Sequence, residues 1–117
     1  MSSTGYAAVW QDGGPPMAGR ILLDAAALDF EGAGRGRQAS CRIAYGEIAS
    51  SRLGRGSLER IGGRPALVLE LRDGETIRVA TPELGALHEL AEALKESLWR
   101  ESQRNGALVD NGAVRSR

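Results

Sequence analysis

The sequence predicts a mainly β fold of the α+β class, in which two packed antiparallel sheets are capped by one C-terminal amphipathic helix. Short segments with apolar residues at every second position, separated by Gly, Pro and Asp, fill the chain to about residue 80. A longer segment with apolar spacings of three and four follows. A length of 117 residues suits one domain. We place it at residues 6–100, between flexible ends at 1–5 and 101–117.

The alternating segments predict about seven strands. The candidates are 6–10, 19–23, 27–31, 39–45, 48–53, 65–72 and 76–81, of which the fifth has the weakest pattern. An even-length turn at residues 24–27 keeps the apolar residues of the second and third strands on one face. These inward residues are Ile21, Leu23, Leu28 and Phe30. In the fourth strand Cys41, Ile43 and Tyr45 share a side.

The hairpin at Asp73-Gly74 is predicted to have a three-residue loop. A two-residue loop would pair Leu69 with Arg78 and place the apolar residues of the two strands on different faces. A loop of residues 72–74 pairs Leu69 with Ile77 instead, so both strands face the core. This geometry needs a left-handed residue, and Gly74 can adopt that conformation at little cost.

A helix is predicted to start at Thr81-Pro82-Glu83, with a hydroxyl at the N-cap, proline at the first helical position and an acid in the first turn. Its spacing predicts four to five turns and one buried face. The apolar stripe consists of Leu84, Leu87, Ala91, Leu94 and Leu98, widened by Leu90.

Four segments together resemble GRAM-like and bacterial pleckstrin-homology-like domains. They are GRILL at 19–23, ALDF at 27–30, RIAYGEI at 42–48 and LVLELRDGETIRV at 67–79, and the resemblance covers roughly residues 6–100. It implies a seven-stranded PH-like barrel with one open end plugged by the terminal helix, and it implies that Trp99 is part of that plug. Trp10 is either a core residue or an exposed anchor. A small β-sandwich with an appended helix is the competing fold.

Composition and charge exclude several classes of protein. Fifteen basic and fifteen acidic residues give a net charge of +0, so no bulk attraction to nucleic acid or anionic membrane is expected. A single Cys and a single His allow neither a disulfide nor a zinc cluster, and we expect no metal and no cofactor. No stretch has the pattern of a membrane span or a signal peptide, which predicts a cytoplasmic protein.

Loop arginines are the candidate contacts for an anion. In phosphoinositide-binding pleckstrin homology domains the first loop is basic, but the corresponding residues 11–18 contain no Lys or Arg. Arg35 and Arg37 in a Gly-rich turn are a possible substitute, and so are Arg52 and Arg55 in a later loop. The plainer interpretation of both segments is a solvated turn. Because no aromatic residue is interleaved for base stacking, nucleic-acid binding is not expected.

The sequence therefore favours a non-enzymatic interaction module. His88 lies off the apolar stripe with no catalytic partner in the pattern, and Cys41 faces inward like a small apolar residue. The leading hypothesis is binding of a protein or peptide, or of a second copy, through a sheet edge or loop end. The alternative is a peripheral binder of anionic lipid or of a small phosphorylated ligand through the loop arginines.

Overall fold

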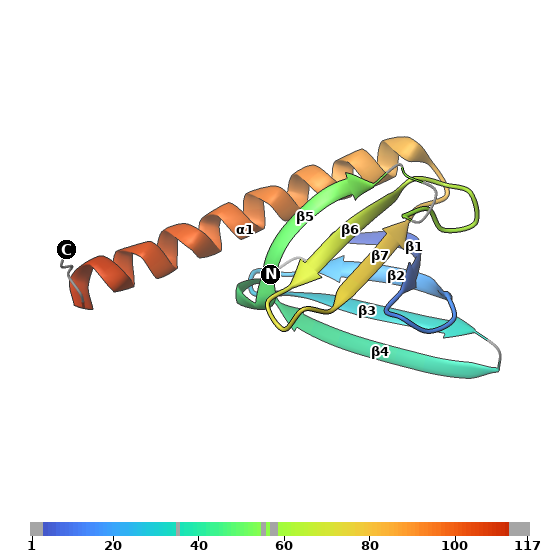
Figure 1. Ribbon diagram of the computed structural model, residues 1–117, viewed down its shortest axis with the longest axis horizontal. Helices are drawn as coiled ribbons and strands as arrows, with labels where there is room; N and C mark the ends of the chain where they lie inside the picture. Colours follow the sequence, from blue (N-terminus) through green and yellow to red (C-terminus); the bar gives the residue numbers. More distant parts are fainter. Residues whose placement is uncertain (1–3, 35, 55, 57–58, 113–117) are drawn as a thin grey trace.

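Within the described residues, seven strands and one α-helix form the fold, in the order that the sequence predicts (Figure 1). The structure is a computed structural model that describes residues 4–34, 36–54, 56 and 59–112. The strands are β1 (Thr4–Gln11), β2 (Met17–Leu23), β3 (Ala27–Gly34), β4 (Arg37–Ala44), β5 (Ile48–Gly54), β6 (Ala66–Leu71) and β7 (Thr76–Ala80). A short 3₁₀ helix, η1 (Tyr45–Glu47), connects β4 to β5, and α1 (Leu84–Gly112) completes the chain.

All seven strands belong to one antiparallel sheet in the order β4-β3-β2-β1-β7-β6-β5. Strand β1 pairs with β2 through residues 4–10 and with β7 through residues 9–11, so it joins β2–β4 to β5–β7. The two sheets expected from the sequence are therefore two halves of one bent, continuous sheet, and the helix lies over β5 (Figure 1).

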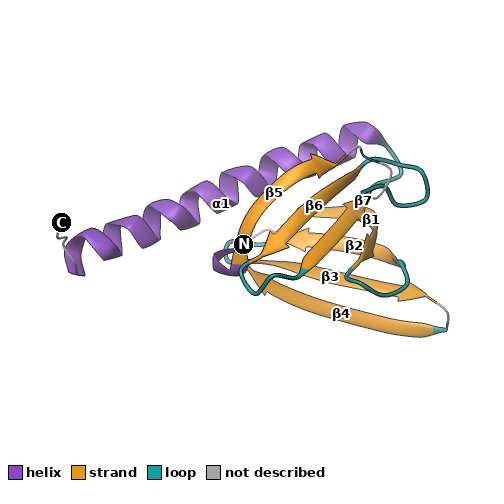
Figure 2. Cartoon of the chain, in the orientation of Figure 1, coloured by secondary structure: helices purple, strands orange, loops and turns teal. Residues whose placement is uncertain are grey.

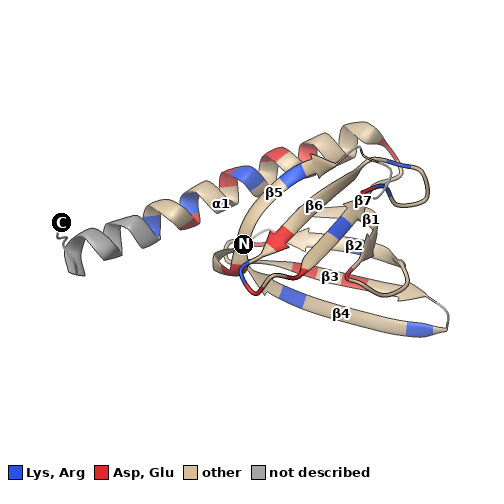
Figure 3. Ribbon diagram, in the orientation of Figure 1, with Lys and Arg blue, Asp and Glu red and all other residues tan. Residues whose placement is uncertain are grey.

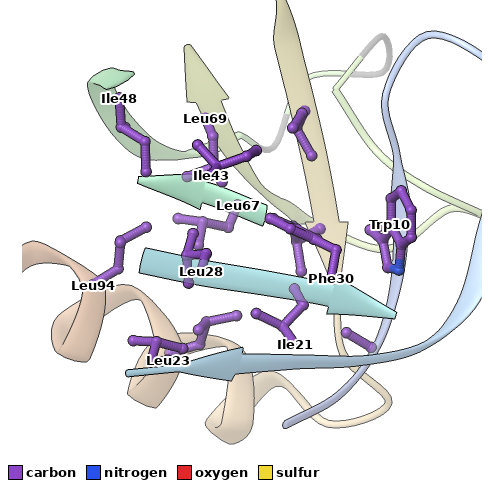
Figure 4. Packing of buried hydrophobic residues seen from close by; sticks show 14 of the residues in the cluster. Trp10, Ile21, Leu23, Leu28, Phe30, Ile43, Ile48, Leu67, Leu69 and Leu94 are labelled. Carbon is purple, nitrogen blue, oxygen red and sulfur yellow. The ribbon is translucent and has the colours of Figure 1, made fainter. Parts of the chain in front are cut away.

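The core lies between the two halves of the sheet and the first part of α1. The inward residues of β2 and β3 share one face, as predicted, and Ile21 lies opposite Phe30 and Leu23 opposite Leu28. Trp10 is buried and its ring meets that of Phe30 edge to face, at a centroid distance of 5.4 Å. From the helix, Leu94 points into this cluster (Figure 4). Leu87 and Leu90 are also buried, so the central part of the predicted stripe is confirmed.

The last hairpin has the predicted register. Leu69 stands opposite Ile77 and Leu67 opposite Val79, and all four side chains are buried. The Leu71 amide donates to the Glu75 carbonyl at 2.8 Å, which leaves residues 72–74 as the loop. Gly74 has a φ of 94°, so its left-handed conformation is confirmed.

Replacing Gly74 with valine tests this turn. A Cβ at Gly74 would meet no atom within 4 Å, so any loss of stability comes from the backbone conformation alone. We expect Gly74→Val to lower the free energy of unfolding by more than about 1 kcal/mol in denaturant titrations, because β-branched residues are strained at positive φ. Gly74→Asn should lose less, since Asn tolerates this region better. Equal stability of the valine variant and the native chain would contradict the proposed role of Gly74.

The start of α1 differs from the prediction by two residues. Its first backbone bond runs from the Leu87 amide to the Glu83 carbonyl at 3.3 Å, so the helix begins at Leu84 and Thr81 is not its N-cap. The Thr81 hydroxyl instead donates to the Glu83 carbonyl. Arg64 donates to the Pro82 carbonyl at 3.1 Å and to the Thr81 carbonyl at 3.4 Å. These bonds hold both carbonyls outside the helix.

Three further expectations about the helix are corrected. Leu84, predicted within the buried stripe, is 49% exposed, and Trp99, implied as part of the plug, is 62% exposed. The helix also continues to Gly112 instead of ending near residue 100, and its C-terminal part runs past the sheet (Figure 1). Flexibility of residues 101–117 stays a prediction. Within the described residues, no helix is long and apolar enough to cross a membrane.

Candidate functional site

Strand β4 forms an open edge of the sheet (Figure 2). It is eight residues long and pairs with β3 on one side only, because it is the first strand in the sheet order. The other edge strand, β5, has α1 lying alongside it. An unpaired strand presents a row of backbone donors and acceptors, which is the usual template for pairing with another chain. Strand β4 is therefore the candidate site.

The ladder between β3 and β4 shows which backbone groups face outward. The Tyr45 amide donates to the Ala26 carbonyl at 3.1 Å, which makes these two residues a hydrogen-bonded pair at the end of the ladder. Hydrogen-bonded and non-hydrogen-bonded pairs alternate in an antiparallel ladder. The register then turns the N–H and C=O groups of every second β4 residue toward the open edge. These residues are Gln38, Ser40, Arg42 and Ala44.

An open hollow of about 810 Å³ lies next to this edge, on the outward face of the sheet. It spans β2, β3 and β4, and the exposed side chains around it are short or polar. They are Ala18, Arg20, Glu31, Ala33, Gln38 and Ser40. The Arg20 Nε lies 3.3 Å from the Glu31 Oε1. The hollow leaves room for side chains of a strand that pairs with β4.

A charged cluster fixes the end of β4 that is nearest to η1. The Arg42 guanidinium lies 3.0 Å from the Asp24 carboxylate and 2.7 Å from that of Asp29. The other Asp24 oxygen accepts the amides of Ala26 and Ala27 at 2.7 and 2.8 Å. Those amides, together with Arg42, lower the pKa of Asp24. The charge of Arg42 is thus compensated within the protein.

The four arginines predicted as anion contacts are distributed over different parts of the chain. Arg35 and Arg55 lie outside the described residues. Arg37 is exposed at the start of β4, whereas Arg52 is on β5, at the opposite edge of the sheet. The structure therefore does not bring Arg37 and Arg52 together.

Their electrostatic surroundings also differ. Arg52 lies 2.5 Å from the Glu59 carboxylate and 3.8 Å from that of Glu70, so acidic side chains compensate its charge. Hydrogen bonds from Arg52 and from the Gly56 amide lower the pKa of Glu59. Within the part of the chain that is described, Arg37 has no ion-pair partner. Of the predicted contacts that can be placed, Arg37 alone lies at the β4 edge.

The remaining sequence candidates do not form a reactive cluster. Cys41 is partly buried on β4, and desolvation raises the pKa of its thiol, which favours the protonated form at neutral pH. His88 is exposed on α1. Among the described residues, no three His, Cys, Asp or Glu side chains gather in a way that suits a metal ion.

The sequence predicts a contact surface at a sheet edge or loop end but does not identify the edge. Strand order depends on pairs far apart in the chain, such as Val9 with Ala80, and no local pattern encodes them. One local signal was present in β4. Its residues 38–41 are small or neutral, whereas a strand inside the core usually carries larger apolar side chains.

Comparisons with known proteins support the fold. No family model and no curated protein matches the chain. A solved structure described as the C-terminal domain of an unknown protein from Leishmania infantum is similar at a TM-score of 0.66 and 18% identity, with 82% of each chain covered. The Vps36 N-terminal PH domain is similar at a TM-score of 0.64 and 18% identity, covering 88% of this chain and 80% of that one.

These similarities extend over most of the chain and agree with its seven antiparallel strands and C-terminal helix. At this level of identity they concern the fold and not the ligand. The bent seven-stranded sheet closed by one helix, together with its similarity to a PH domain, shows that the protein has a pleckstrin-homology-like fold.

Proposed function

We propose that the protein is a non-enzymatic interaction module that binds an extended segment of a partner protein along β4. The proposal rests on one observation, the uncovered eight-residue edge of the sheet. In strand addition, main-chain hydrogen bonds supply affinity and side-chain pockets supply specificity. PH-like domains generally serve as interaction modules, which agrees with this role.

The chemistry of the edge favours an extended peptide. Outward backbone groups at residues 38, 40 and 42 offer a repeating set of donors and acceptors. The hollow beside them is lined largely by short side chains and accepts alternate side chains of the added strand. Because Asp24 and Asp29 compensate Arg42, this end of the edge does not repel a cationic peptide.

Blocking one outward amide tests the proposal. A displayed library of random peptides is selected against the full chain, and the selected peptides are measured against Ser40→Pro and Ser40→Ala. Proline removes an N–H that faces solvent, at a place where edge strands tolerate it. Alanine keeps the N–H and removes the hydroxyl only. We expect Ser40→Pro to lose peptide binding and Ser40→Ala to keep it.

Amide hydrogen exchange supplies an independent readout. In the free chain the amides of Gln38, Ser40 and Arg42 should exchange fast, because no strand protects them, and a bound peptide should slow all three. Unchanged exchange at these amides, or binding that is equal in the proline and alanine variants, would overturn the proposal. If Ser40→Pro does not fold, Gln38→Pro provides the same test at the next outward amide.

Vesicle sedimentation separates the proposal from anion binding. The full chain is mixed with anionic or neutral vesicles at low and high salt. We expect no sedimentation with either kind. Salt-sensitive binding to the anionic vesicles alone, lost in Arg37→Ala, would support a lipid headgroup as ligand and contradict the peptide proposal.

A further inference from the structure

The outward face of α1 carries a row of charges at intervals of four residues. Its members are Glu92, Glu96, Arg100 and Arg104, and all four side chains are exposed. Residues four apart lie above one another on a helix, so they form one continuous ridge. Within this row the acidic pair comes first and the basic pair follows. Figure 3 shows charged residues of both signs along α1. Such a ridge is complementary to itself when a second copy lies antiparallel to it.

Trp99 lies next to this ridge. It is 62% exposed and, with Leu84, makes up the large apolar side chains that are exposed in the described part of the chain. A hollow of about 450 Å³ adjoins the Trp99 ring, with Glu92, Ala93, Lys95 and Glu96 around it. An exposed tryptophan beside a hollow is a typical anchor of a protein interface.

The length of α1 also indicates that the charged ridge is a contact surface. The helix contacts η1 and β5, and beyond them its C-terminal part extends past the sheet (Figure 1). Helical turns that pack against nothing are marginal in water. A second helix along the ridge would support the projecting part of α1.

We propose that two copies of the protein associate through antiparallel α1 helices, with Trp99 near the twofold axis. This alignment sets Glu96 level with Arg100 of the second copy, and Glu92 level with its Arg104. Both contacts occur twice, as a twofold interface requires. The sheets lie on the opposite side of each helix, so they point away from the contact. A parallel alignment would instead place like charges level with each other.

Ion pairs within one helix do not oppose this association strongly. Glu96 and Arg100 lie 2.7 Å apart, and Arg104 pairs with Glu101. Glu96, Arg100 and Arg104 are each more than 60% exposed, and exposed pairs of this kind contribute little. These carboxylates and guanidinium groups can therefore form ion pairs with a second helix, because little stability is lost when the pairs within one helix rearrange.

Sedimentation velocity of the full chain, from low to high micromolar concentration, tests the proposal. We expect a reversible dimer. Trp99→Ala should raise its dissociation constant at least about tenfold, as loss of a central aromatic anchor does. The matched control is Leu84→Ala, which removes the other exposed apolar side chain of the same helix and should leave the constant unchanged. A native chain that stays monomeric throughout would overturn the proposal.

Charge reversal tests the antiparallel alignment. One chain carries Glu92→Arg and Glu96→Arg, so its ridge is wholly basic; a second carries Arg100→Glu and Arg104→Glu, so its ridge is wholly acidic. Each alone should be monomeric because like charges meet, and an equimolar mixture should form a heterodimer. Variants that self-associate like the native chain, or a mixture that stays monomeric, would contradict the alignment. If a double variant does not fold, the two single variants Glu96→Arg and Arg100→Glu, each measured alone and then mixed in equal amounts, repeat the test.

Discussion

Gly19→Ala is expected to lower the free energy of unfolding by about 3 kcal/mol or more, at the upper end of overpacking effects. A Cβ at Gly19 would lie 2.0 Å from the Glu31 carbonyl oxygen and 2.6 Å from the Gly32 Cα. Both atoms belong to the backbone of β3, so no side-chain rotation relieves the contact. The two strands would have to separate where they now pair.

The close approach of β2 and β3 at Gly19 has a structural reason. Gly19 and Gly32 are direct partners in the register of β2 and β3. A Cβ at Gly32 would lie 2.9 Å from the Trp10 indole nitrogen, which in turn donates to the Glu31 carbonyl at 3.3 Å. Gly32 therefore leaves room for the Trp10 ring against β3, and Gly19 lets the backbones of β2 and β3 approach each other beside it. Glycines in strands commonly mark such bends and close approaches.

Gly85→Ala is the matched control. Gly85 lies in the first turn of α1, its φ is not positive, and a Cβ there meets no atom within 4 Å. This variant should keep the native stability or gain up to about 1 kcal/mol, because alanine favours the helix. Both variants are measured by urea titration. A Gly19→Ala variant that loses less than about 0.5 kcal/mol would contradict the close approach of β2 and β3 at Gly19.

Local patterns were sufficient to predict the register of the last hairpin and the shared face of β2 and β3. Alternation in two neighbouring segments fixes which residues share a face, and a slip of one position would turn every side chain over. For this reason the sequence predicts that Ile21 and Phe30 share a face and that Leu69 pairs with Ile77. Gly74 followed from the same argument, since the required loop length leaves one position at positive φ.

The end of α1 and the exposure of Trp99 were not predictable from apolar spacing. A period of three and four shows a buried face only where a core is present to cover it. Beyond the core, charged pairs along the surface support the helix, such as Glu96 with Arg100, and these pairs carry no apolar period. The end of the pattern was therefore mistaken for the end of the helix.

The candidate site depended on strand order, which alternation does not encode. Arg37 and Arg52 are each beside a turn or loop in the sequence, and nothing local separates them. The pairing of β1 with β7 joins the two halves of the sheet, and as a result β4 and β5 lie at opposite edges. That pairing connects residues about 70 apart in the chain, beyond the reach of any periodic pattern.

Leu94→Ala is expected to lower the free energy of unfolding by about 2 to 5 kcal/mol, the usual range for a leucine truncated in a packed core. Leu94 is fully buried and joins α1 to the cluster that includes Leu23 and Leu28 (Figure 4). Its removal leaves a cavity where the helix closes the sheet, and neighbouring side chains are held by strands that cannot move into it.

Leu84→Ala makes the same substitution on the same helix, at a side chain that is 49% exposed. It should cost less than about 1 kcal/mol, because much of that side chain is already in contact with water. Urea titrations at low chain concentration keep any association of helices from contributing to the difference. Equal losses in the two variants would mean that Leu94 does not close the core. The expected difference in stability loss comes from burial, because both variants replace a leucine of α1 with alanine.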